Sequence, residues 1–100
     1  MTQPLEEVCT LDDLREFVNA TLCRRENLVR DQFRMIEMEL KKAGRICGMQ
    51  FSIHGPRQLR LSAVWAADKN VIYFYDPGGA RFQKTALKNR IAFEADRAAA

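Results

Sequence analysis

The sequence predicts an α+β domain in which two N-terminal helices pack on one face of a four-stranded antiparallel meander sheet. Apolar residues recur every three or four positions before Gly44 and every second position after it. These are the periods of an amphipathic helix and of a half-buried strand. The later apolar segments are joined by short turns rich in glycine and proline, so neighbouring strands are expected to run antiparallel.

The first helix is expected over residues 11–24. Its apolar stripe has steps of three and four and is formed by Leu11, Leu14, Val18 and Leu22. Thr10 is suited to cap this helix, and the acids Asp12 and Asp13 favour its first turn.

The second helix is expected over residues 29–43. It would present a similar stripe, formed by Val29, Phe33, Ile36, Leu40 and Ala43. Gly44 follows at the position where a helix commonly ends. Together the two helices make residues 11–43 a helical half.

Residues 46–86 are expected to form the meander, with strands at 47–53, 59–65, 71–75 and 81–85. The turns between them are assigned to Gly55-Pro56-Arg57, Ala67-Asp68-Lys69-Asn70 and Pro77-Gly78-Gly79. Residues 87–100 then form either a short C-terminal helix or a disordered tail.

The turn lengths predict the pairing of the strands. A three-residue turn at 55–57 pairs Ile53 with Leu59 and sets Cys47 inward, opposite Trp65. A four-residue turn at 67–70 sets Trp65 opposite Ile72. A three-residue turn at 77–79, with Gly79 in the left-handed conformation, sets Phe74 opposite Phe82.

This register directs two tyrosines and two arginines to the face of the sheet away from the helices. One outward row reads Gln50, Ser62, Tyr75, Arg81, and the next reads Gly48, Val64, Tyr73, Gln83. Tyr and Arg are enriched where protein partners bind. The candidate partner-binding residues are therefore Arg60, Ser62, Tyr73, Tyr75, Arg81 and Gln83. Outward tyrosines can equally serve to stabilise the sheet.

Composition and charge limit the function without defining it. The chain has 100 residues and is read as one domain, residues 1–100. Residues 1–50 hold eight Lys/Arg and nine Asp/Glu, and residues 51–100 hold eight and four, so the strand half is mildly basic. No run of 18 apolar residues and no export signal are present, which predicts a cytoplasmic protein without a membrane span.

The common catalytic and cofactor-binding motifs are missing from the sequence. It contains no GxGxxG, P-loop, HExxH or GxSxG pattern. Cys9, Cys23 and Cys47 lack the spacing of a metal site and are expected to be reduced and mostly buried. His54 is the only histidine and is expected to be a polar residue at a strand end. We therefore predict no catalytic residue, no cofactor and no metal.

The sequence is compatible with three classes of function. The favoured hypothesis is a non-catalytic protein-interaction module that binds an unidentified protein, or a second copy, through the outer sheet face or a sheet edge. The alternative is a weak nucleic-acid or polyanion-binding domain. Its phosphate contacts would come from the basic residues of the strand half: Arg57, Arg60, Lys69, Arg81, Lys84, Lys88 and Arg90. The third hypothesis is an enzyme with an unrecognised site.

Overall fold

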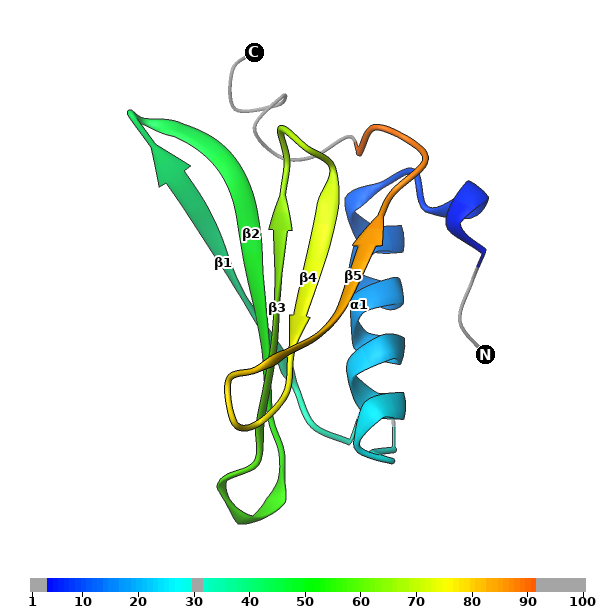
Figure 1. Ribbon diagram of the computed structural model, residues 1–100, viewed down its shortest axis with the longest axis vertical. Helices are drawn as coiled ribbons and strands as arrows, with labels where there is room; N and C mark the ends of the chain where they lie inside the picture. The colour runs from blue at the N-terminus through cyan, green and yellow to red at the C-terminus, as the bar shows by residue number, and fades with distance from the viewer. Residues whose placement is uncertain (1–3, 30–31, 92–100) are drawn as a thin grey trace.

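The computed structural model describes residues 4–29 and 32–91, which form one α-helix and a five-stranded antiparallel sheet (Figure 1). The strands follow one another in the sheet in chain order, β1-β2-β3-β4-β5. The helix α1 lies on one side of the sheet, and we call the opposite side the outer face (Figure 1). The α+β class and the meander are as predicted, whereas the numbers of helices and strands differ.

The helix α1, Leu11–Arg25, begins with the cap that the sequence predicts. The side-chain oxygen of Thr10 accepts a hydrogen bond from the backbone N–H of Asp13, at 3.1 Å. The Asp13 carboxylate accepts one in return from the Thr10 N–H, also at 3.1 Å. This reciprocal box satisfies N–H groups that have no partner within the helix. A short 3₁₀ turn, η1 at Leu5–Glu7, precedes it.

The predicted second helix over 29–43 is wrong, because the chain forms strand β1, Met35–Lys42, there instead. This is the fifth strand that the sequence reading lacks. Ile36, Met38 and Leu40 alternate with Glu37 and Glu39, so the segment carries the period of a strand as well as that of a helix. Val29, the first member of the expected helical stripe, is 67% exposed. The stripe is therefore not a buried helical face, and the segment pairs with β2 as a strand instead of forming a helix.

A two-residue turn joins β1 to β2, Arg45–His54, and Lys42 pairs with Arg45 across it. Its residues Ala43 and Gly44 have φ of 53° and 77°. Positive φ at both central residues is the feature of a type I′ hairpin turn, which asparagine followed by glycine fits best. Gly44 is thus a turn residue within a hairpin and not the end of a helix.

Ala43→Asn is expected to stabilise the protein by up to about 1 kcal/mol, because asparagine tolerates the left-handed backbone better than alanine. Chemical denaturation would show a higher midpoint with an unchanged slope. Gly44→Ala is the matched control and is expected to lower the midpoint, since its φ is also positive. A lower midpoint for Ala43→Asn would contradict the turn assignment.

The pairing of β2 with β3, Arg60–Ala66, is shifted by two residues from the prediction. Ile53 pairs with Leu61 and Met49 with Trp65, because the connection contains a 3₁₀ turn, η2 at Pro56–Gln58, and is longer than three residues. A shift of two keeps the inward residues from Met49 to Ile53 and from Leu61 to Trp65 on their predicted face. Cys47 does not lie opposite Trp65, and it is exposed beside an irregularity in the β1–β2 register.

The pairing of β3 with β4, Val71–Tyr75, agrees with the prediction: Trp65 lies opposite Ile72 and Ala63 opposite Phe74. The last strand, β5 at Arg81–Ala86, is an edge of the sheet, as expected. Its register with β4 shifts at Tyr75, so that Tyr75 pairs with Arg81 while Phe74 pairs with Gln83. Phe82 is therefore the extra residue of a β-bulge.

The core lies between α1 and the inner face of the sheet. Leu14, Val18 and Leu22 of α1 are fully buried. They belong to one cluster with the inward residues of the central strands, which include Phe51, Ile53, Leu61, Trp65, Ile72 and Phe74. Phe82 packs against this cluster, and its ring centroid lies 6.0 Å from that of Phe74. The inward face of β2, β3 and β4 is thus the predicted one.

A chain of hydrogen bonds joins the core to both ends of the described chain. The indole N–H of Trp65 donates to Asn70 Oδ1 at 3.1 Å, and Asn70 Nδ2 donates to the carbonyl of Asn89 at 2.7 Å. The Asn89 side chain donates to the carbonyl of Glu6 at 2.9 Å. Residues 87–91 of the predicted tail form no helix, and Ile91 is buried; the rest of that tail lies outside the described residues.

Two further expectations concern the cysteines and a membrane span. All three cysteines are free, but only Cys23 is buried, so the expectation of mostly buried thiols is wrong for Cys9 and Cys47. Within residues 4–29 and 32–91, α1 and the other helical segments fall short of the length and apolar character that a membrane span needs.

Candidate interaction surface

The outer face consists of three rows of side chains that cross all five strands. The register sets Ile36, Ser52, Ser62, Tyr75 and Arg81 side by side in the first row. The second row contains Met38, Gln50, Val64, Tyr73 and Lys84. The third contains Leu40, Gly48, Ala66, Val71 and Ala86. Among the described residues no helix or strand lies over these rows (Figure 1).

The structure brings five of the six predicted partner-binding residues to this face. Ser62, Tyr75 and Arg81 are neighbours in the first row, and Tyr73 is in the second. Arg60 is exposed and pairs with His54 at the end of β2 and β3, one step beyond the first row. His54 is itself exposed at this strand end, as expected of a polar terminal residue.

Gln83 is the predicted residue that does not belong to the outer face. The bulge at Phe82 places Gln83 opposite Phe74, whose side chain is in the core. Gln83 Nε2 donates a hydrogen bond to Thr85 Oγ1 at 3.0 Å, on the same side of β5. Lys84 takes the place expected for Gln83, opposite Tyr73. The sequence carried no clear signal for the extra residue, because the turn 77–79 permits either register.

The Tyr73 ring lies under two cations from β5. The guanidinium carbon of Arg81 is 5.3 Å from the ring centroid, and the Lys84 ammonium nitrogen is 5.9 Å from it. Each such contact contributes about 0.5–1 kcal/mol at an exposed site. The contacts also draw both charges away from the sheet edge and over β4.

Ile36 and Met38 are the members of the face that the sequence reading missed. Their side chains are 51% and 56% exposed, which is unusual for residues of this size. They sit at the β1 edge, in the segment assigned to a helix. The strict alternation of Ile36, Met38 and Leu40 with glutamates was the available signal.

On β2 and β3 the first and third rows of the face carry short side chains, and the second row carries Gln50 and Val64. Gly48, Ser52, Ser62 and Ala66 occupy the first and third rows there, between longer side chains of β1 and β4. Ser52 is only 9% exposed although it points outward. Its neighbours in the row are the longer Ile36 and the equally short Ser62, so the two middle strands form a low floor there.

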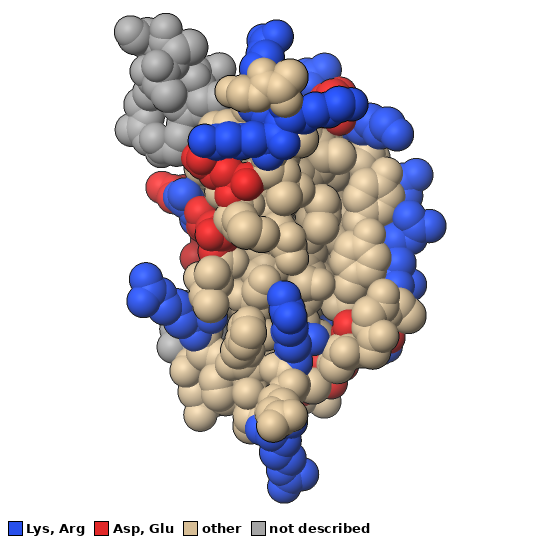
Figure 2. All heavy atoms as spheres, turned by 90° about the vertical axis from the view of Figure 1, so that its left-hand side faces the viewer, with Lys and Arg blue, Asp and Glu red and all other residues tan. Residues whose placement is uncertain are grey.

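The charge of the face has one sign. None of the residues in the three rows is an aspartate or glutamate. Asp76 follows β4, but its carboxylate accepts hydrogen bonds from the N–H groups of Gly78 and Ala80, at 3.0 and 2.9 Å. Figure 2 shows the face as a broad area of mostly uncharged residues, with Lys and Arg around much of its margin and Asp and Glu gathered at its upper left and lower right.

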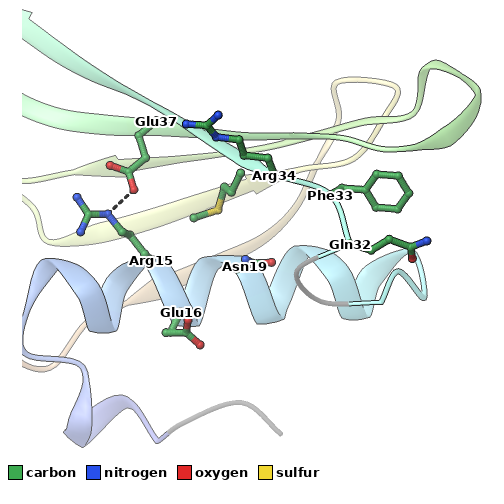
Figure 3. A pocket seen from close by; sticks show the side chains of 8 residues that line it. Arg15, Glu16, Asn19, Gln32, Phe33, Arg34 and Glu37 are labelled. Atoms are coloured by element: carbon green, nitrogen blue, oxygen red, sulfur yellow. Dashed lines mark hydrogen bonds and ion pairs between the residues drawn. The ribbon is translucent and has the colours of Figure 1, made fainter.

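The opposite side of β1 carries the acids. Glu37 forms an ion pair with Arg15 of α1, and this partner raises the pKa of the Arg15 guanidinium (Figure 3). These two residues line an open pocket of about 470 Å³ between α1 and β1, together with Asn19, Phe33 and Arg34 (Figure 3). Arg15 is also paired with Asp12, so two carboxylates neighbour its guanidinium.

No group of three or more His, Cys, Asp and Glu side chains converges as a metal site within residues 4–29 and 32–91. The Cys23 thiol donates to Asn19 Oδ1 at 3.1 Å, within one helix.

Comparisons of the chain with models of protein families, with curated proteins and with solved structures find no match.

Proposed function

We propose that this chain is a non-catalytic protein-interaction module that binds a partner through its outer face. One observation carries the proposal: on a sheet face that no described element covers, Ile36 and Met38 stand exposed at the β1 edge. At the other edge, the half-buried Tyr73 and Tyr75 lie beside cations of β5. Contiguous exposed apolar surface of this kind marks interaction sites in soluble proteins. Tyr on β4 and Arg on the neighbouring edge strand β5 are residue types that contribute most binding energy at interfaces.

The nucleic-acid alternative has weaker support. Among its proposed phosphate contacts, Lys88 forms an ion pair with Glu6 at 3.0 Å, and the Arg90 guanidinium donates to the carbonyl of Ala67 at 3.2 Å. A basic surface that binds nucleic acid clusters its cations along one track. Here the three rows meet β1 at Ile36, Met38 and Leu40, and the lysines of that strand, Lys41 and Lys42, stand together at its end.

The test is site-specific photocrosslinking in cells that produce the chain naturally, with the crosslinker at Ser62. It is expected to join the chain to a protein of defined mass. Arg60→Ala/Tyr75→Ala/Arg81→Ala should reduce the yield at least about tenfold without unfolding the chain, since interface hot spots contribute about 2 kcal/mol or more each. A crosslinker at Ala20 of α1 is the control and should remain unreacted.

Two results would contradict the proposal. Equal yields from Ser62 and from Ala20 would mean that the outer face is not the contact surface. Crosslinking of Ser62 to nucleic acid alone would establish the alternative. Thermal melts show whether the triple variant is folded. We expect it to remain folded, because the three substituted side chains lie outside the core.

A further inference from the structure

We propose that the partner presents an acidic amphipathic α-helix, which lies along the strands over β2 and β3. Its apolar side chains contact Ile36, Met38 and Val64, and its carboxylates pair with Arg81 and Lys84. This inference rests on the proposed function and adds the chemistry and the orientation of the partner. It follows from the division of the outer face into an apolar side on β1 and a cationic side on β5.

The first two rows change character from one edge to the other. They begin on β1 with an exposed apolar side chain, Ile36 or Met38, and end on β5 with a cation, Arg81 or Lys84. Tyr75 and Tyr73 stand next to the cations. A ligand that fits both sides must be apolar along one side and acidic along the other, which is the pattern of an amphipathic helix.

The dimensions fit a single helix. Adjacent strands are about 4.8 Å apart, so β1 and β4 are separated by about 14 Å. Because Arg81 and Lys84 reach back over Tyr73, their charges bound this space on the β4 side. A helix with its side chains is about 10–12 Å wide. Short side chains in the first and third rows of β2 and β3 form the floor on which it would rest, with Gln50 and Val64 rising between them in the second row.

The charges and the exposed apolar side chains of the outer face argue against two other occupants. A second copy of this chain, placed face to face, would set Arg81 and Lys84 opposite the same cations or opposite the apolar β1 side, and in neither arrangement opposite an acid of these rows. Like charges opposed across an interface are unfavourable. A nucleic acid would leave the exposed apolar side chains of Ile36 and Met38 without apolar contacts.

The test uses the full chain and labelled helical peptides of 16 residues, which span about 24 Å. One peptide carries leucine on one side and glutamate on the other. A second replaces each glutamate with lysine, a third replaces each leucine with serine, and a 16-nucleotide single strand is the fourth probe. Fluorescence anisotropy measures affinity at low and moderate salt, and NMR shift changes locate the binding surface.

The leucine–glutamate peptide is expected to bind on the outer face at least about tenfold more tightly than the other three probes, and more weakly as salt rises. Lys84→Glu and Met38→Ser should each weaken this binding at least threefold. Arg24→Glu makes the same charge change on exposed α1 and should leave it unaltered. If Lys84→Glu fails to fold, Lys84→Gln replaces it.

Three outcomes would overturn the inference. They are failure of the leucine–glutamate peptide to bind, equal binding of the lysine peptide or the oligonucleotide, and equal effects of Arg24→Glu and Lys84→Glu. None of these decides the proposed function, which the crosslinking from Ser62 tests independently. A protein crosslink at Ser62 combined with peptide failure would keep the interaction module and reject the acidic helix.

Discussion

Gly48→Ala is expected to destabilise the protein by about 3 kcal/mol, a large part of the 5–15 kcal/mol that holds a typical domain folded. A Cβ atom at Gly48 would lie 2.1 Å from the carbonyl oxygen of Trp65. That oxygen belongs to the backbone of the neighbouring strand, so no side-chain rotation relieves the overlap. Strands β2 and β3 would have to separate where the Ala67 N–H donates to the Cys47 carbonyl at 2.9 Å.

Thermal unfolding measures this effect directly. A loss of 3 kcal/mol lowers the melting temperature of a domain of this size by more than about 10 °C. Gly78→Ala is the matched control: its Cβ would meet only the Asp76 side chain, at 3.4 Å, which is an ordinary contact. We expect Gly78→Ala to melt within a few degrees of the parent chain. Equal melting of Gly48→Ala and Gly78→Ala would contradict the close approach of β2 to β3.

Phe51→Ala is expected to cost about 3–5 kcal/mol, because it removes a large buried side chain and leaves a cavity. Phe51 is fully buried on the inner face and pairs with Ala63. Tyr75→Ala removes an aromatic side chain of similar size from the outer face and is the matched control. Cross-strand aromatic pairs contribute about 0.2–1 kcal/mol, so Tyr75→Ala should cost no more than about 1 kcal/mol.

Urea denaturation of the two variants tests the assignment of the faces. The midpoint should fall strongly for Phe51→Ala and little for Tyr75→Ala, with similar slopes. The reverse order would mean that the outer face is the buried one. The proposed interaction surface would then be lost together with the acidic-helix inference that depends on it.

The structure agrees with the prediction where contacts between near neighbours in the sequence favour a single local structure. Thr10 and Asp13 cap α1 through contacts three residues apart, which need no tertiary partner. The turn between β3 and β4 ends at Asn70, whose φ is 55°, and the predicted pairing of Trp65 with Ile72 holds. The inward positions of β2 survived even a two-residue error in register, because an even shift preserves the face.

The structure departs from the prediction where the sequence pattern fits two local structures equally well. Residues 35–42 carry both a helical and an alternating pattern, and hydrogen bonding to β2 selects the strand. This choice adds Ile36 and Met38 to the outer face. The register of β5 was open in the same way, and a bulge at Phe82 exchanges Gln83 for Lys84 beside Tyr73.

By itself, the sequence determined the α+β class, the capped first helix and the alternation that directs Tyr73 and Tyr75 away from the core. These features depend on residue spacing and on contacts between near neighbours. Only the tertiary structure decided the fifth strand and the bulge of β5, because both depend on backbone pairing between strands. The apolar side of the outer face on β1 and its cationic side on β5 therefore arise from strand pairing, and neither follows from the residues of β1 or of β5 alone.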